Sequence, residues 1–346
     1  MFKSFTIENF RCFKRLELPR LGRINLIAGR NDVGKTSLLE AIFLHLHPTD
    51  PRQSVKVDFF RGVLRADADA DKTWGWLFHG RSVGQKSVLV SVAADGTRTL
   101  EIQLTPGGAA ALLELRFRDS LGRESRTRGR LSSPSPTEPA GVFRETFERS
   151  SKDPNDPERM GLPPCLFYSS FYMNPSEEAN YLDVLVRQRR EGEVVEAIRK
   201  LDPRVSGVSL GFQAGAPVIY VDVALRERIP MAYLGDGATR LLRYLVGICN
   251  CRDAVVLIDE VENGFHHSIL ADVWRALDTA CRNANVQLFA TTHSWECIRA
   301  AAETFKDADE AAFAFHRLEQ TPEGVKAVTA APQAIEAAVA SGFEVR

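Results

Sequence analysis

The chain of 346 residues has the composition of a folded globular protein, with 44% hydrophobic and 26% charged residues. These proportions exclude wholesale disorder. The formal net charge of −1 excludes a strong overall field that would attract nucleic acid or a basic partner. At about 150 residues per domain, the length predicts roughly two domains.

The six cysteines are scattered along the chain, which favours reduced thiols over a disulfide framework. Cys249 and Cys251 have no second Cys or His pair nearby, so packing in an apolar element is favoured over zinc binding. No apolar run approaches the roughly 18 residues of a membrane helix. Charges interrupt residues 1–17, where a signal peptide would have an apolar core. We therefore expect a cytoplasmic protein without a membrane partner.

Hydrophobic periodicity predicts strands followed by a helix in the first 50 residues, and more strands later. The predicted strands are 2–8, 16–18, 24–28, 87–92, 99–104 and 112–117, and the helix is 35–46. Between residues 119 and 158, Arg, Ser, Pro, Asp and Glu dominate. That composition predicts long, mobile loops, interrupted by one short helix near 142–149.

The second half alternates between helical and strand-like segments. Helical spacing at 176–201 stops at Asp202-Pro203, because a residue before proline is disfavoured in the α region. The remaining predictions are strands at 218–223, 254–258 and 286–291, helices at 236–249 and 267–284, a hairpin of 312–318 with 325–329, and a helix from Pro332 closed by Gly342.

The strongest motif is GRNDVGKT at 29–36, which matches G-x-x-x-x-G-K-[ST] between a predicted strand and a predicted helix. Gly29 and Gly34 let backbone N–H groups close around a polyphosphate at a helix N-terminus. Lys35 would bring its charge to the β- and γ-phosphates, and the Thr36 hydroxyl would ligate Mg²⁺. We predict nucleotide contacts from Gly29, Asn31, Asp32, Val33, Gly34, Lys35, Thr36 and Ser37.

Two other motifs follow buried strands. Four aliphatic residues at 255–258 lead into Asp259 and Glu260, and ligands bind at the carboxyl ends of such parallel strands. Asp259 would hold Mg²⁺, directly or through water, and Glu260 would deprotonate the attacking water. The apolar run at 288–290 leads to His293, which could reach a γ-phosphate. The predicted catalytic residues are therefore Lys35, Glu260 and His293.

Together these motifs resemble the ABC-type ATPase superfamily, and most closely its RecF/OLD-like and SMC-like branch of short stand-alone OLD-type ATPases. The segment NFRCF at 9–13 resembles the opening of that branch, in which the arginine (here Arg11) lies near the nucleotide. The resemblance covers about 1–48 and 205–305. It implies ATP and Mg²⁺ as ligands and an α/β fold, namely an ABC-type head with a RecA-like mixed sheet, an antiparallel β subdomain and a helical lobe.

In that superfamily two ATP molecules lie between two heads, and a signature loop of each head completes the other's site. The candidate loop LGDGATR at 234–240 departs from the LSGGQ-like form, with Gly235 in place of the serine. The resemblance implies trans contacts from Gly235, Asp236 and Gly237 in a homodimer. Asp236 would either cap its own helix or pair with a cation such as Arg240.

The motif spacing predicts a discontinuous head of residues 1–48 and 205–346, with 49–204 inserted as a β/helical lobe. The 197 residues between Thr36 and Leu234 are too few for a long SMC-type coiled-coil arm, and the segment after His293 is too short for a Toprim nuclease domain. No glutamine matches the superfamily's Q-loop; Ser169 and Ser170 stand in its approximate place.

The resemblance implies slow, Mg²⁺-dependent ATP hydrolysis that drives head-to-head dimerisation. One expected role is a sensor ATPase that controls a separately encoded nuclease or toxin in bacterial anti-phage defence. The alternative is a RecF-like repair ATPase that clamps duplex DNA, to which six arginines at 116–130 would contribute. Acidic residues are interspersed among these arginines, which favours a solvated surface, and the balanced net charge of the chain slightly favours the first role.

Overall fold

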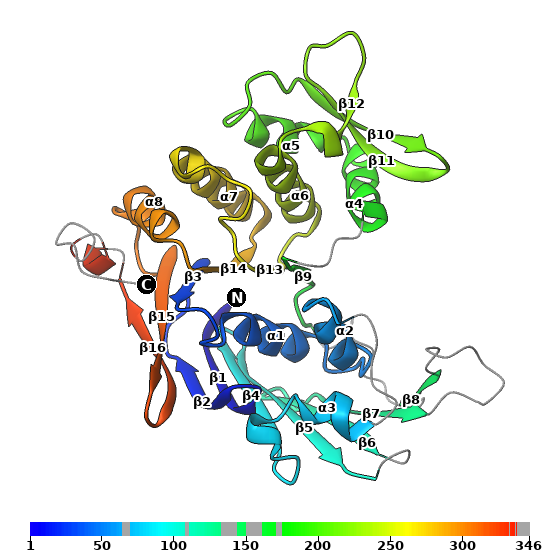
Figure 1. The fold of residues 1–346 in the computed structure, drawn as a ribbon, viewed down its shortest axis with the longest axis vertical. Coiled ribbons are helices and arrows are strands. Elements are labelled where there is room, and N and C mark those ends of the chain that lie inside the picture. The colour runs from blue at the N-terminus through cyan, green and yellow to red at the C-terminus, as the bar shows by residue number, and fades with distance from the viewer. Residues whose placement is uncertain are drawn as a thin grey trace.

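The computed structural model describes residues 1–63, 70–107, 111–132, 144–149, 161–170, 175–331, 333–335 and 337. The described strands form three sheets, stacked with helices between them (Figure 1). A six-stranded sheet crosses the middle of the molecule. Five helices of the second half cover one face, and α1 separates the other face from a seven-stranded antiparallel sheet.

The six-stranded sheet contains the three strands that the predicted motifs follow, namely β3, β13 and β14. Its β3, β9, β13, β14 and β15 are parallel and only β16 is antiparallel, so the loops that follow β3, β13 and β14 meet at one edge. Every residue of β3, β13 and β14 is buried, which explains their apolar runs. The order is β16 (Gly324–Ala330), β15 (Phe313–Thr321), β3 (Ile24–Gly29), β14 (Gln287–Thr292), β13 (Val255–Ile258) and β9 (Cys165–Tyr168).

The seven-stranded sheet buries one face against α1 (Lys35–Leu46). Because sheets enclose α1 on two sides, nearly all of its residues are buried rather than a single stripe. The sheet order is β2 (Phe13–Leu18), β1 (Phe2–Phe10), β4 (Ser87–Ala93), β5 (Gly96–Thr105), β6 (Leu112–Asp119), β7 (Glu124–Ser132) and β8 (Arg144–Arg149). Two short helices, α2 (Gln53–Phe59) and α3 (Ala70–Gly75), follow α1 in the chain.

The helical lobe lies on the opposite face of the central sheet (Figure 1). Its helices are α4 (Pro175–Arg187), α5 (Glu191–Ile198), α6 (Asp236–Asn250), α7 (Leu270–Ala284) and α8 (Trp295–Phe305). A small sheet of β10 (Gly207–Gln213), β11 (Ala216–Asp222) and β12 (Ile229–Pro230) covers the lobe, and 3₁₀ turns occur at His79–Arg81, Met231–Tyr233 and His267–Ile269.

Three sequence expectations are corrected. The stretch 119–158 contains β7 rather than only loops, and the residues expected in a short helix near 142–149 form β8 where they are described, at 144–149. Both segments are polar and become strands through pairing, β7 with β6 and β8 with β7. The expected helix 176–201 is two helices, because Arg189 adopts a left-handed conformation with φ of 57°. Residues 133–143 and 150–158 and Gly342 lie outside the described residues.

The two predicted segments of the chain share both large sheets. From residues 49–204, β4 pairs with β1 and β9 pairs with β13. The division into a head (1–48 and 205–346) and an insert (49–204) stays a prediction about chain organisation. None of the described helices has the length and apolar character needed to cross a bilayer.

Two buried histidines predict a loss of stability in acid. Burial lowers the pKa of both His45 and His316 to about 3, whereas an unfolded histidine titrates near 6.5. The unfolded chain therefore binds more protons below pH 6.5, and the free energy of unfolding should fall as the pH drops, by about 2 kcal/mol per histidine at pH 5. Denaturant unfolding at pH 7 and pH 5 measures this loss.

The control for this prediction compares a buried with an exposed histidine. His45→Gln should remove about half of the histidine-dependent loss, since the Gln side chain does not titrate. His267→Gln, at an exposed position, should leave the loss unchanged. Equal losses in the parent and in His45→Gln would contradict the prediction.

Candidate active site

The phosphate loop joins β3 to α1, and its glycines are required by conformation and by space. Gly29 and Gly34 have φ values of 150° and 103°, where L side chains are strained. A Cβ at Gly29 would lie 2.7 Å from the Leu318 carbonyl oxygen, and one at Gly34 would lie 2.8 Å from the Phe13 ring. Only glycine lets the loop fold this closely against its neighbours.

Lys35 is folded back over this loop. Its Nζ donates to the carbonyl oxygens of Gly29, at 2.8 Å, and Arg30, at 2.9 Å. Burial lowers the pKa of Lys35, while the charges of Asp259, Glu262 and Glu260 oppose that shift. The ammonium group therefore lies within the loop, in the electrostatic field of nearby carboxylates.

Thr36 and Asp259 meet from distant parts of the chain. Thr36 Oγ1 lies 3.0 Å and 3.2 Å from the two Asp259 carboxylate oxygens, and Thr291 Oγ1 donates to Asp259 Oδ1 at 2.6 Å. Burial raises the pKa of Asp259, against the effect of these hydroxyl hydrogen bonds. A hydroxyl and a carboxylate are the hard oxygen donors that Mg²⁺ takes in addition to phosphate oxygens. The pair therefore fits the predicted metal site.

Glu260 follows directly, in a left-handed conformation with φ of 53°. Its N–H donates to Thr291 Oγ1 at 2.8 Å. Its carboxylate Oε2 accepts hydrogen bonds from Ser170 Oγ, at 3.0 Å, and Asn263 Nδ2, at 2.7 Å. The strained backbone and two donors fix this half-exposed carboxylate at the edge of the sheet.

His293 lies beside two carboxylates. Its ring Nδ1 is 3.2 Å from Glu262 Oε1 and 3.8 Å from Glu260 Oε1. Its backbone N–H donates to Glu262 Oε1 at 2.9 Å. The Glu262 side chain is only 10% exposed, and its Oε2 has no hydrogen-bond partner among the described residues. Sequence reasoning did not single out Glu262, although it is the next acid after Glu260 in the same loop.

Arg11 lies against the helices rather than over the loop. Its Nε is 3.1 Å from Oε2 of the fully buried Glu40 in α1, and its Nη2 is 2.9 Å from Asp58 Oδ1 in α2. Arg61, which sequence reasoning also missed, pairs with Glu40 and donates to Ser37 Oγ at 2.9 Å. The nucleotide contact of Arg11 stays a prediction, and no motif in the sequence points to Arg61.

The outer part of the phosphate loop borders an open cavity. Asn31 and Asp32 are exposed, whereas Val33 is buried. Together with Arg30 and 317–320 of β15, they line a cavity of about 630 Å³.

The signature-like loop packs against the loop that follows Glu260. A Cβ at Gly237 would lie 2.8 Å from the Gly264 carbonyl oxygen, and one at Gly264 would lie 3.0 Å from Arg240 Cδ. Gly235 and Asp236 are exposed at the start of α6. Among the described residues, no ion pair joins Asp236 to Arg240, and no hydrogen bond or ion pair joins Gly235, Asp236 or Gly237 to the phosphate loop.

The arrangement of these elements defines the class of protein. A phosphate loop, an Asp-Glu pair and a histidine follow three neighbouring parallel strands, with an antiparallel sheet on one side and a helical lobe on the other. This is the arrangement of an ABC-type P-loop ATPase.

A family model described as "AAA domain, putative AbiEii toxin, Type IV TA system" matches residues 102–298, more than half of the chain, and the chain belongs to this family. A model described as "AAA ATPase domain" matches residues 1–72. The chain is therefore an ATPase, as its motifs predicted.

The relatives agree with this class. An "ATP/GTP phosphatase" of Helicobacter pylori is 22% identical over 337 residues, which cover 89% of this chain and 90% of that protein. The "DNA replication and repair protein RecF" of Clostridioides difficile is 43% identical over 42 residues, or 12% of this chain and 11% of that protein. Among solved structures, the SmcHead bound to the C-winged helix domain of ScpA has a TM-score of 0.52 at 13% identity, covering 95% of this chain and 98% of that one. The predicted α/β head fold is confirmed.

Proposed function

We propose that this chain hydrolyses ATP with Mg²⁺ and uses ATP-dependent head-to-head dimerisation to regulate a separately encoded effector protein in the cytoplasm. The observation that carries the proposal is the convergence of Lys35, the Thr36–Asp259 pair and Glu260 at one edge of the central sheet. Each of these groups has a distinct part in phosphoryl transfer to water.

The phosphate loop and its lysine bind the triphosphate. Backbone N–H groups between Gly29 and Ser37 donate to phosphate oxygens at the start of α1, and Lys35 Nζ exchanges its carbonyl partners for the β- and γ-phosphates. Thr36 and Asp259 hold Mg²⁺, which neutralises charge on the phosphate oxygens when bound. Arg61, through Ser37 Oγ, holds the first turn of α1 in place.

Glu260 and His293 act at the γ-phosphate. Ser170 and Asn263 orient the Glu260 carboxylate, which takes the proton of the attacking water while the bond from the γ-phosphorus to ADP breaks. His293 keeps its Nδ1 toward Glu262, so its Nε2, the other ring nitrogen, would face the phosphate. Glu262 is therefore a positioning residue for His293.

The signature-like loop supports a site completed by a second head. Gly235 and Asp236 are exposed, and Gly237 packs on the Walker B loop of its own chain. In a homodimer Gly235, Asp236 and Gly237 would contact the nucleotide of the other head across two sandwiched ATP molecules. The carboxylate of Asp236 weakens such a contact to phosphate, which suits slow turnover.

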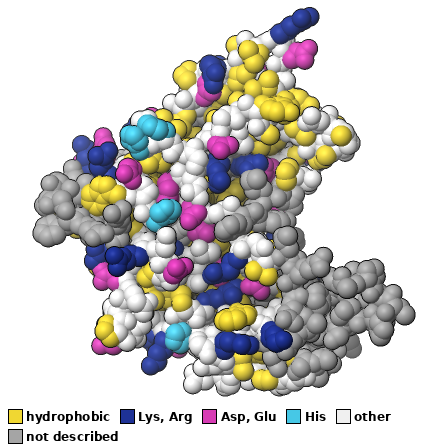
Figure 2. Space-filling view, viewed as in Figure 1, with side chains coloured by type: hydrophobic (Ala, Val, Ile, Leu, Met, Phe, Trp, Pro, Cys, Tyr) yellow, Lys and Arg dark blue, Asp and Glu magenta, His cyan; other side chains and the backbone are white. Residues whose placement is uncertain are grey.

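The regulatory role draws support from the family and from the surface charges. The family description names a putative toxin of a type IV toxin–antitoxin system, which favours a two-component system in anti-phage defence and, with the motifs, an OLD-like branch. On the face in Figure 2, basic and acidic side chains are interspersed on both lobes.

A RecF-like clamp on duplex DNA is the second candidate, favoured by the local match to RecF. Against it, Glu114 pairs with Arg116, Arg126 and Arg128 of the arginine cluster. Although burial raises the pKa of Glu114, the hydrogen bonds from these arginines lower it to about 2. The carboxylate thus stays charged and offsets part of the positive charge that DNA would need.

Co-expression with the product of the adjacent gene tests the regulatory role. We expect a complex whose stability or effector activity changes when ATP is hydrolysed, and no steep salt-dependent binding to duplex DNA. ATP-dependent DNA binding with a steep salt slope, lost when the arginines at 116–130 are neutralised, would instead establish the clamp.

A further inference from the structure

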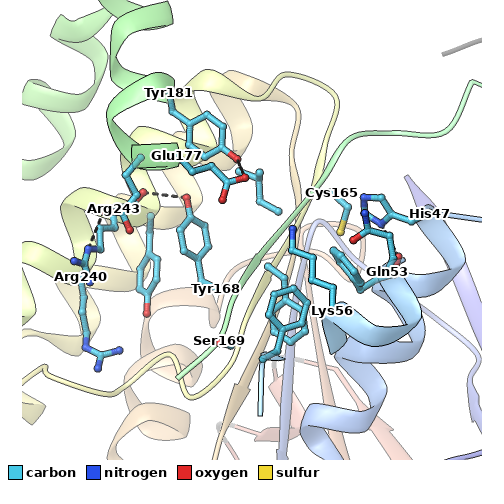
Figure 3. Close-up of a pocket in the computed structure, with 16 residues that line it drawn as sticks. His47, Gln53, Lys56, Cys165, Tyr168, Ser169, Glu177, Tyr181, Arg240 and Arg243 are labelled. Carbon is cyan, nitrogen blue, oxygen red and sulfur yellow. Dashed lines mark hydrogen bonds and ion pairs between the residues drawn. The ribbon is translucent and has the colours of Figure 1, made fainter. Parts of the chain in front are cut away.

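A second cavity, of about 210 Å³, opens at the free edge of the central sheet (Figure 3). Strand β9 is the last strand of that sheet and lines the cavity. His47, Gln53 and Lys56 lie on one side of β9, and Tyr181 and Arg243 lie on the other. The cavity shares no lining residue with the phosphate loop.

The edge of β9 supplies polar backbone groups to this cavity. Val255 N donates to the Pro164 carbonyl and Asp259 N to the Tyr168 carbonyl, so these carbonyls point toward β13. In a parallel ladder alternate residues face opposite neighbours. Cys165 and Phe167, at the alternate positions, therefore turn their N–H and C=O groups to the side where no described strand pairs with β9.

One wall of the cavity carries an ammonium group without a described carboxylate partner and a buried acceptor without a described donor. Lys56 Nζ lies 5.9 Å from the ring centroids of Phe43 and Phe60, and among the described residues it forms no ion pair with a carboxylate. Gln53 Oε1 is buried and has no hydrogen-bond partner in the described part of the chain. Buried polar atoms are normally satisfied, so this wall is complementary to an anion next to a donor.

The remaining surface is largely aromatic, and it also carries the charged side chains of Glu177, Glu178, Arg240 and Arg243. The Phe60 and Phe167 rings lie 4.4 Å apart between centroids, and those of Tyr168 and Tyr244 lie 5.1 Å apart. On the far wall Arg243 pairs with Glu178 at 3.1 Å. Such walls suit a planar ring. The volume is below the roughly 300 Å³ at which pockets for drug-sized ligands begin, which favours a small metabolite over a peptide segment.

We propose that this cavity is a second ligand site, which binds a small planar aromatic acid with its carboxylate or phosphate on Lys56 and a hydrogen-bond donor on Gln53 Oε1. The ring lies between the phenylalanine and tyrosine walls. Just beyond β9, Ser170 holds Glu260, and on the other wall Arg240 packs against Gly264. A bound acid should therefore change the rate of ATP hydrolysis, a consequence that rests on the proposed function of Glu260, whereas binding does not.

Calorimetric titration tests the site with three probes: indole-3-carboxylate, 4-hydroxybenzoate and phenyl phosphate. The protein is saturated with ADP and Mg²⁺, so that the phosphate loop is occupied. We expect at least one acid to bind once per chain, and its neutral amide or alcohol analogue to bind at least tenfold more weakly. Lys56→Met keeps the apolar stem but removes the charge, and should weaken binding of the acid about tenfold or more. Lys326→Met, an exposed lysine on β16, is the matched control.

Melting temperature and basal ATP hydrolysis establish that Lys56→Met is folded. The site is refuted if no acid binds at millimolar concentration, if Lys56→Met binds as tightly as the parent, or if binding vanishes when the phosphate loop is occupied. An acid that binds through Lys56 without changing the hydrolysis rate leaves the site established and refutes only its coupling to Glu260.

Discussion

Lys35→Ala should lower ATP affinity by about 100-fold or more and reduce hydrolysis to background. Its ammonium group is the buried cation of the phosphate loop, whereas Arg30 of the same loop is exposed, and charge-assisted hydrogen bonds contribute about 1.5–3 kcal/mol each. In ATP the ammonium would bridge two phosphates, so both bonds are lost together. Binding of a fluorescent ATP analogue and release of phosphate measure the two effects.

The substitution is not expected to unfold the protein. Among the described residues, Lys35 Nζ donates hydrogen bonds to two carbonyl oxygens of its own loop, and these oxygens can accept hydrogen bonds from water once the ammonium is gone. Circular dichroism should be unchanged, and Lys326→Ala, at an exposed position on β16, should retain both binding and hydrolysis. A Lys35→Ala protein that hydrolyses ATP at the parent rate would show that the loop does not hold the triphosphate.

The motifs could be predicted because their chemistry is local. Phosphate-loop residues are contiguous, and the strands β3, β13 and β14 are rich in apolar residues, so buried parallel strands with their carboxyl ends at one edge could be expected. From this, the meeting of Thr36 with Asp259 follows without any knowledge of the remaining chain.

Other features depend on contacts between distant elements, which one sequence does not reveal. Glu262 gains its place beside His293 because the loops after β13 and β14 meet. Arg61 reaches Ser37 and Glu40 from the end of α2, and no motif marks it. Strand β7 has the composition of a loop, and its partner β6 makes it a strand. Pairing overrode local composition there, as it often does in sheets.

Glu260→Gln should lower kcat for ATP hydrolysis by about 10²–10⁴-fold while ATP still binds. A glutamine oxygen can still accept the hydrogen bonds from Ser170 and Asn263, so the loop keeps its geometry, but an amide cannot take the proton of the attacking water. ATP therefore stays bound, and light scattering after size-exclusion chromatography should show a shift from monomer to dimer with ATP and Mg²⁺.

Two further variants separate this effect from a general loss of charge. Glu262→Gln weakens the hold on His293 but leaves Glu260 in place, so kcat should fall without a stable dimer, because residual hydrolysis still releases the heads. Glu323→Gln, an exposed acid in the turn between β15 and β16, should leave rate and mass unchanged. If Glu260→Gln turned over ATP like the parent, another group would be the base. Suppose instead that Glu260→Gln bound ATP without hydrolysing it and stayed monomeric. The role of Glu260 as the base would then stand, but ATP-driven dimerisation would be refuted. Regulation would then have to act through a single head.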